Sequence, residues 1–152
     1  MQVNKQIQYQ TEGGIRVRRS AHELPYATAI GQLATSLDEN LGVLLASSFE
    51  FPGRYTRWDI GFINPPIQIT SRNRDIEITA LNTRGEILLP ELYRVVKKCD
   101  AVKNLQHERS KIQLTVKLED NNLQEEMRTR RASVFSILRA IIQCFKNPDE
   151  PY

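Results

Sequence analysis

The sequence contains few of the residues that mark a specialised fold class. Among its 152 residues are only 2 cysteines, 7 glycines and 7 prolines, which excludes a disulfide-dense scaffold, a collagen-like repeat and a proline-rich disordered chain. The longest stretch without a charge, Leu24 to Leu37, contains Pro25 and Gly31. It falls short of the roughly 20 apolar residues that a bilayer requires, so we expect no membrane role. Hydrophobic residues make up 40% of the chain, and the length fits one soluble globular domain.

Basic side chains are in slight excess but are not concentrated. The formal net charge is +3 and the isoelectric point is about 9.0. Domains dedicated to nucleic-acid binding usually gather Lys and Arg on one face, whereas no segment of this sequence is a basic tail. The run Arg128, Arg130 and Arg131 is more typical of a solvated helix face. Charge alone therefore does not predict a nucleic-acid partner.

No pattern of catalytic or metal-binding side chains stands out. Cys99 and Cys144 form no CxxC motif and follow no secretory leader, which favours a reducing, cytoplasmic compartment. Both lie in apolar patterns that are typical of helices, where a free thiol packs as a small hydrophobic group. His22 and His107 lie in polar segments that we expect to be solvated loops. The carboxylates show no paired spacing for acid–base catalysis, and a bare pair of glycines is too short for a phosphate-binding loop.

Hydrophobic periodicity alternates between that of helices and that of strands. Apolar residues at three- and four-residue spacing predict helices over residues 26–37, 86–97 and 123–145. Alternating or short apolar runs predict strands near residues 15–18, 43–45, 58–63, 67–71, 76–81 and 112–118. The run at 43–45 is expected to be an interior strand, and polar residues 72–75 fit a hairpin turn. These elements predict an α+β fold with a mostly antiparallel sheet and flanking helices.

One segment combines side chains that suit a small ligand. Residues 47–59, SSFEFPGRYTRWD, place two hydroxyls after a predicted strand, followed by Arg54, Arg57 and several aromatic residues. Arginine pairs bidentately with carboxylates and aromatic rings provide apolar walls, which suits a ligand with a carboxylate and an apolar body. The alternative is a surface turn in which the two arginines cover Tyr55 and Trp58 by stacking. The residues by themselves leave both interpretations open.

Several strings in the chain resemble the N-terminal region of anthranilate synthase component I, especially the form fused to its glutamine amidotransferase. The matching strings are GIRVR (14–18), SSFEFPGRYTRWDIG (47–61), NPP (64–66), IQIT (67–70), IEITAL (76–81), NTRG (82–85) and LLPEL (88–92), with a weaker match at SVFSIL (133–138). The resemblance spans most of the chain. The string PGRYTRWD is specific enough to make a chance match an unsatisfactory explanation.

The resemblance implies that residues 1–152 are the N-terminal, regulatory region of such an enzyme, an incomplete part of a larger chorismate-enzyme fold. The family is a lyase of tryptophan biosynthesis that converts chorismate, and ammonia from glutamine, into anthranilate and pyruvate with Mg²⁺. Its chorismate and magnesium residues belong to a C-terminal chorismate-binding region, so no catalytic or metal-binding residue is expected in this segment. The expected partners are that region, the glutamine amidotransferase and L-tryptophan, without nucleic acid or membrane. The last six residues, Asn147 to Tyr152, fit either a linker into further protein or a natural tail.

The resemblance also implies a tryptophan feedback site in the first third of the chain. A Leu-Leu-Glu-Ser motif of the family ends in a ligand-contacting serine that falls on Ser48, and the glutamate before it falls on Ser47. A family lysine falls on Trp58, with Arg57 adjacent and Arg54 nearby. We expect Ser48 to bond the amino-acid end of tryptophan, with Arg54 or Arg57 supporting the site electrostatically. The alternative for Ser48 is a hydroxyl bonded to its own backbone.

Three other functions stay open from the sequence. A related chorismate enzyme, such as aminodeoxychorismate synthase or isochorismate synthase, would share the architecture. A nucleic-acid-binding module built on Arg54, Tyr55, Arg57 and Trp58 would stack bases and depend steeply on salt. A plain interaction domain would dock an amidotransferase without contributing to the reaction.

Overall fold

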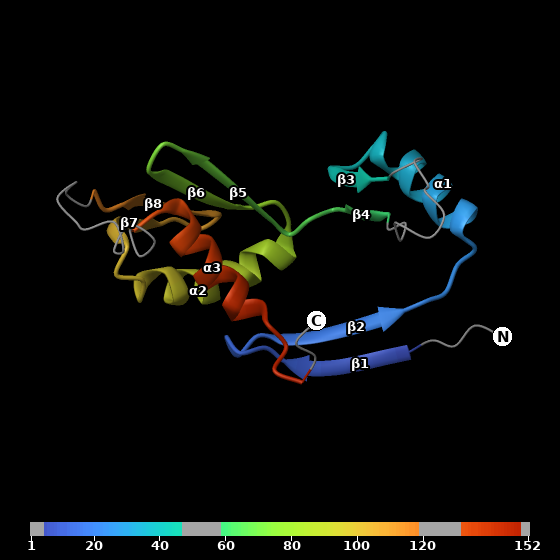
Figure 1. Ribbon diagram of the computed structural model, residues 1–152, viewed down its shortest axis with the longest axis horizontal. Coiled ribbons are helices and arrows are strands. Elements are labelled where there is room, and N and C mark those ends of the chain that lie inside the picture. The colour runs from blue at the N-terminus through green and yellow to red at the C-terminus, as the bar shows by residue number, and fades with distance from the viewer. Residues whose placement is uncertain (1–4, 47–58, 119–131, 150–152) are drawn as a thin grey trace, which may run out of the picture. The chain divides into compact units, whose positions relative to one another are not determined.

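The computed structural model describes residues 5–46, 59–118 and 132–149, which form eight strands and three helices (Figure 1). The strands are β1 Lys5–Gln10, β2 Arg16–Ala21, β3 Gly42–Leu45, β4 Ile60–Ile63, β5 Ile67–Arg72, β6 Asp75–Ala80, β7 Val102–His107 and β8 Lys111–Val116. The helices are α1 Tyr26–Leu37, α2 Thr83–Lys97 and α3 Val134–Phe145. The strands from β3 onward pair antiparallel, so the predicted α+β class with antiparallel sheets is confirmed.

The chain divides into two compact units. Unit 1 comprises residues 1–5 and 21–65, and unit 2 comprises residues 6–20 and 66–152. Unit 1 holds α1, β3 and β4. Unit 2 holds a four-stranded sheet, α2, α3 and nearly all of the β1–β2 pair. Length alone predicts one domain, whereas the chain divides into two units.

The sheet of unit 2 has the strand order β5-β6-β8-β7. Arg72 pairs with Asp75 across the β5–β6 hairpin, which leaves Asn73 and Arg74 as a two-residue turn. Asn73 has a φ of 55°, a left-handed conformation that asparagine tolerates better than most residues. The predicted turn at residues 72–75 is therefore confirmed.

One face of this sheet is apolar, and α2 and α3 pack against it. Alternation along β6 and β8 directs every second side chain to this face, and α2 adds apolar residues at three- and four-residue spacing. The core consists of Ile76, Ile78, Leu89, Leu92, Val96, Ile112, Leu114, Val116, Ile137 and Ile141. Each of these side chains contributes roughly 2 kcal/mol by leaving water, and together they fix the positions of both helices.

The string NTRG (82–85), one of those that carry the resemblance, forms the start of α2, with Asn82 as the N-cap. The Asn82 side chain accepts hydrogen bonds from the N–H groups of Arg84 at 3.1 Å and Gly85 at 3.2 Å, which caps the helix. Gly85 approaches the sheet so closely that a Cβ there would lie 2.1 Å from the carbonyl oxygen of Pro66. Both residues therefore serve the helix start.

The turn between β1 and β2 closes the C-terminal end of α3. The N–H of Glu12 donates to the carbonyl of Lys146 at 2.9 Å, and the N–H of Gly13 donates to the carbonyl of Cys144 at 3.0 Å. The last carbonyls of a helix have no partner within it, so these bonds satisfy two such groups. This contact ties the N-terminal strand pair to α3 within unit 2.

In unit 1, α1 packs against one face of the β3–β4 pair. A Cβ at Gly61 would lie 2.1 Å from Leu33 Cδ2, and one at Gly42 would lie 2.7 Å from Leu37 Cδ2. The two glycines thus leave room for the leucines of α1. The helix begins after Pro25 and covers residues 26–37, as its apolar spacing predicts.

Two sequence predictions in these units are wrong. The run at residues 43–45 is a strand, but it is not interior: among the strands of the described residues, β3 pairs only with β4, and Val43 and Leu45 are exposed. His107 does not lie in a loop, because it ends β7 and its ring stacks on Tyr93 with centroids 4.9 Å apart.

Other boundaries differ more modestly. Strands β1 and β7 were not anticipated, α2 begins at Thr83 rather than at residue 86, and Cys99 follows α2 instead of lying within it. Part of the helix expected over residues 123–145 lies outside the described residues; in its described part the helix begins at Val134, after the N-cap Ser133, and ends at Phe145 as α3. In the described part of the chain, the helices are too short or too polar to cross a bilayer.

Candidate functional site

The four predicted ligand residues, Ser47, Ser48, Arg54 and Arg57, lie outside the described residues. The strands on either side of them are described. Leu45, at the end of β3, pairs with Ile60, at the start of β4. The sequence that carries these four residues therefore connects two neighbouring, hydrogen-bonded strand ends.

The end of that connection is fixed to α1. The hydroxyl of Tyr26, the first residue of α1, donates a hydrogen bond to the carboxylate of Asp59. Asp59 is the last residue of the string PGRYTRWD and directly precedes β4. The last residue of this string, Asp59, is thus hydrogen-bonded to the first residue of α1.

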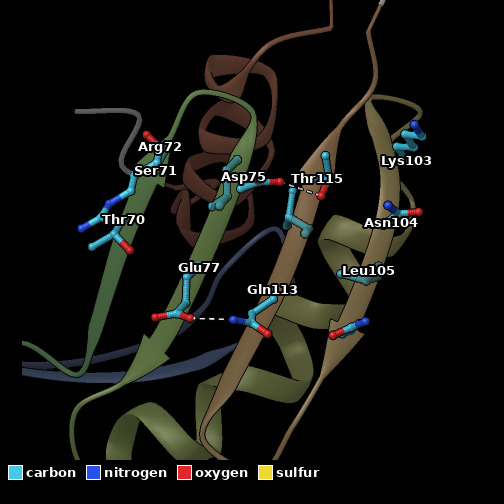
Figure 2. Close-up of a pocket in the computed structure, with 13 residues that line it drawn as sticks. Thr70, Ser71, Arg72, Asp75, Glu77, Lys103, Asn104, Leu105, Gln113 and Thr115 are labelled. Carbon is cyan, nitrogen blue, oxygen red and sulfur yellow. Dashed lines mark hydrogen bonds between the residues drawn. The ribbon is translucent and has the colours of Figure 1, made fainter.

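A polar depression lies on the open face of the unit 2 sheet, opposite the helices. It has a volume of about 1150 Å³ and is lined by residues of all four strands, including Thr70, Arg72, Glu77, Gln113 and Asn104. Figure 2 shows Arg72 on β5 and Lys103 on β7 at opposite sides of this face, with Asp75, Glu77, Gln113 and Thr115 between them. No sequence motif marks this surface, and its only signal in the sequence is the alternation of polar residues along β6 and β8.

The acidic groups of the depression are bonded to their neighbours across the strands. Thr115 Oγ1 donates to Asp75 Oδ1 at 2.7 Å, and Gln113 Nε2 donates to Glu77 Oε2 at 2.8 Å (Figure 2). Lys111 Nζ lies 3.9 Å from the same Glu77 oxygen. These cross-strand pairs stabilise the sheet. The depression is therefore a surface whose acidic side chains are held in cross-strand pairs.

The two cysteines are not activated nucleophiles. Cys144 is buried in α3, and burial raises the pKa of its thiol, with Arg94 opposing the effect. Burial also raises the pKa of the half-buried Cys99, and the negative charge of Asp100 adds to it. Because the thiolate is the reactive form, both groups stay protonated near neutral pH. They act as packing residues.

No metal centre is formed by the side chains of residues 5–46, 59–118 and 132–149. Within these ranges no three residues among His, Cys, Asp and Glu are grouped so that they could hold an ion. His22 is exposed and His107 stacks on Tyr93, so neither histidine is paired with an acid that would orient it for catalysis in the described contacts.

Comparison with known proteins gives the chain a relative. It is similar to a curated protein named anthranilate synthase, from Azospirillum brasilense, with 38% identity over 145 residues. The match covers 95% of this chain and 20% of the relative, so the chain spans about one fifth of the relative's length. The resemblance carried by the strings is therefore confirmed. No protein-family model matches the chain, and no solved structure matches it.

Proposed function

We propose that residues 1–152 are a region of an anthranilate synthase-type polypeptide of the tryptophan pathway, and that this region contributes to a feedback site for tryptophan. The observation that carries the proposal is the similarity to anthranilate synthase along 95% of the chain. The one-fifth coverage of the relative favours a contributing region over a complete enzyme. On this proposal, chorismate, Mg²⁺ and the glutamine amidotransferase are bound by polypeptide beyond these residues.

The acidic groups of the unit 2 sheet face and the two thiols are engaged in structural contacts. The carboxylates of the sheet face are bonded to neighbouring side chains, and both thiols are protonated near neutral pH because burial raises their pKa. A general base needs a carboxylate or imidazole that is held within reach of a substrate proton. The described part of the chain provides none in a suitable arrangement.

The proposed ligand residues are Ser48 and Ser47, with Arg54 and Arg57 as supporting cations. In the family motif a glutamate precedes the serine, and here Ser47 takes its place. A charged hydrogen bond is roughly twice as strong as a neutral one, so the ammonium group of tryptophan would be held more weakly by this pair. The two arginines provide charge for the ligand's carboxylate instead.

A chimera tests the proposal directly. The matching 145 residues of the Azospirillum brasilense enzyme are replaced by those of this chain, and anthranilate formation from chorismate is followed by fluorescence with increasing tryptophan. We expect an active chimera that tryptophan inhibits. Ser48→Ala should raise the half-inhibiting tryptophan concentration roughly ten- to a hundredfold, because a hydrogen bond to a charged group contributes about 1.5–3 kcal/mol and each 1.4 kcal/mol is about a factor of ten.

Ser71→Ala is the matched control, since Ser71 is an exposed serine on β5 in unit 2. It should leave both anthranilate formation and inhibition as they are in the chimera. A folded chimera that makes no anthranilate would contradict the proposed enzyme type. An active chimera whose inhibition is the same with Ser48→Ala would remove that serine from the site.

A further inference from the structure

A side-chain hydrogen bond connects the start of α1 to the start of β4 within unit 1. The hydroxyl of Tyr26 donates to the carboxylate of Asp59, and the two residues are 33 positions apart in the sequence. Tyr26 is the first residue of α1, and Asp59 directly precedes β4. The bond therefore joins the helix of unit 1 to the beginning of one of its two strands.

The bond attaches the end of α1 that apolar packing reaches least. Leu33 and Leu37, which approach the glycines of β3 and β4, lie in the second half of the helix. At its first turn, the N-cap Pro25 makes no side-chain capping bond. The described residues of unit 1 include no buried side chain, so apolar burial fixes this end only weakly. The position of the helix start relative to β4 therefore depends on the bond between Tyr26 and Asp59.

Covalent geometry places this bond close to the predicted ligand residues. Arg57 precedes Asp59 by two positions, and two residues of chain span at most about 7 Å. Ser48 follows Leu45, the last residue of β3, by three positions, which span at most about 11 Å. Leu45 pairs with Ile60, the residue after Asp59. Both predicted groups of ligand residues therefore extend from the strand ends beside the hydrogen bond to α1.

We infer that Tyr26 and Asp59 are positioning residues for tryptophan inhibition, because their hydrogen bond fixes the strand ends from which the ligand residues extend. This inference rests on the proposed function, which assigns tryptophan to Ser48 and Arg57. The two positioning residues act through the chain and do not themselves bind the ligand. A ligand that must order its own binding groups binds more weakly than one that meets groups already in place. Loss of the bond therefore weakens inhibition.

Tryptophan inhibition of the chimera carrying Tyr26→Phe tests this inference. The variant removes the hydroxyl that donates to Asp59 and keeps the ring. We expect the half-inhibiting tryptophan concentration to rise roughly three- to tenfold, because tryptophan must then order these strand ends itself. Tyr93→Phe is the matched control, since it removes a hydroxyl from α2 of unit 2, where the Tyr93 ring stacks on His107. It should leave the half-inhibiting concentration unchanged.

Variants of Asp59 test the same bond from its acceptor. Asp59→Ala removes the acceptor and should weaken inhibition about as much as Tyr26→Phe does. The double variant should be inhibited no more weakly than either single variant, because both substitutions remove one shared bond. Asp59→Asn keeps an oxygen that can accept from Tyr26. Because a charged hydrogen bond is roughly twice as strong as a neutral one, Asp59→Asn should recover part of the inhibition that Asp59→Ala loses.

The opposite results overturn the inference in recognisable ways. An unchanged half-inhibiting concentration for Tyr26→Phe would mean that the bond is structural only. An equally large change in the KM for chorismate, measured without tryptophan, would assign the bond to the fold of the whole enzyme. Additive effects of Tyr26→Phe and Asp59→Ala would mean that the two side chains act separately. An active but uninhibited unsubstituted chimera would contradict the proposed feedback site and this inference with it, so the two failures are distinguishable.

A second measurement needs no substitution and covers the case in which a variant does not fold. Amide hydrogen exchange of the unsubstituted chimera is compared with and without saturating tryptophan. Binding should slow exchange in α1 and β4 by about threefold or more, because a ligand that relies on the bond between them also opposes its opening. The strands β6 and β8 of unit 2 should exchange as before. Unchanged exchange in α1 and β4 would contradict the inference.

Discussion

At the scale of single residues, two helical glycines illustrate how packing decides whether a glycine-to-alanine substitution stabilises or destabilises the protein. Gly31 lies in α1 with no atom within 4 Å of where a Cβ would be, whereas a Cβ at Gly85 in α2 would lie 2.1 Å from the Pro66 carbonyl oxygen. That oxygen also accepts the N–H of Leu81 at 2.9 Å. It cannot move away without weakening this bond, so the two sites should respond oppositely to an added methyl group.

We therefore expect Gly31→Ala to stabilise the chain by about 0.5–1 kcal/mol, because alanine loses less backbone entropy in a helix. Gly85→Ala gains the same helix propensity, but overpacking against the Pro66 carbonyl costs about 1–3 kcal/mol or more. We therefore expect a net loss in the free energy of unfolding. Urea unfolding followed by circular dichroism measures both changes. A gain in stability for Gly85→Ala would mean that the start of α2 shifts easily, and the close approach would then have no energetic importance.

At the scale of elements, α2 carries a proline in its interior. Pro90 has no N–H to donate to the carbonyl of residue 86, and it is exposed on the helix surface. Pro90→Ala should stabilise the chain by about 1–2 kcal/mol, since the interior cost of proline, about 3 kcal/mol, is partly offset by its restriction of the unfolded chain. Urea unfolding again provides the measurement.

Ile87→Ala is the control for this change, because Ile87 is exposed on the same helix and its replacement leaves the backbone bonds unaltered. Its effect should stay within about 0.5 kcal/mol. Destabilisation by Pro90→Ala would indicate that the proline sets a curvature of α2 that the packing of Leu89 and Leu92 requires.

Elements with local signals were predictable from sequence, and elements that depend on distant partners were not. Pro25 and apolar spacing determine α1, and polar residues with Asn73 determine the β5–β6 turn. Strand β7 was missed because a register shift between Val102 and Asn104 breaks its alternation, so that inward-facing Val102 and Leu105 are three residues apart. The exposure of β3 could also not be predicted from the sequence, because an apolar run alone does not reveal whether a strand has one neighbouring strand or two.

The candidate site was predictable only as far as the resemblance carries. Ser48 was assigned by its position in a family motif, whereas Arg57 was chosen because it neighbours the position of a family lysine and can pair with a carboxylate. Similarity to anthranilate synthase supports the resemblance, and the ligand residues stay a prediction. The polar depression beside Glu77 depends on register between β6 and β8, which sequence periodicity does not fix. A ligand site formed by side chains from separate elements therefore needs coordinates before its geometry can be stated.

At the scale of the whole molecule, the two units differ in how much core they have. Unit 2 buries ten hydrophobic side chains in one cluster, whereas the described residues of unit 1 include no fully buried side chain. The free energy needed to open a region locally is lower where the region has fewer buried apolar contacts. The units should therefore open independently in the 152-residue chain, with unit 1 opening more often.

Hydrogen exchange measures this difference element by element. Amides of α1, β3 and β4 should exchange at least about tenfold faster than those of β6 and β8, which open only with the core. Leu89→Ala, in the core of unit 2, should cost about 2–5 kcal/mol and accelerate exchange in β6 and β8. Leu33→Ala, in α1, should accelerate exchange in unit 1 and leave β6 unchanged. Equal protection of α1 and β6 would contradict independent opening, because it would require the two units to unfold as one cooperative structure.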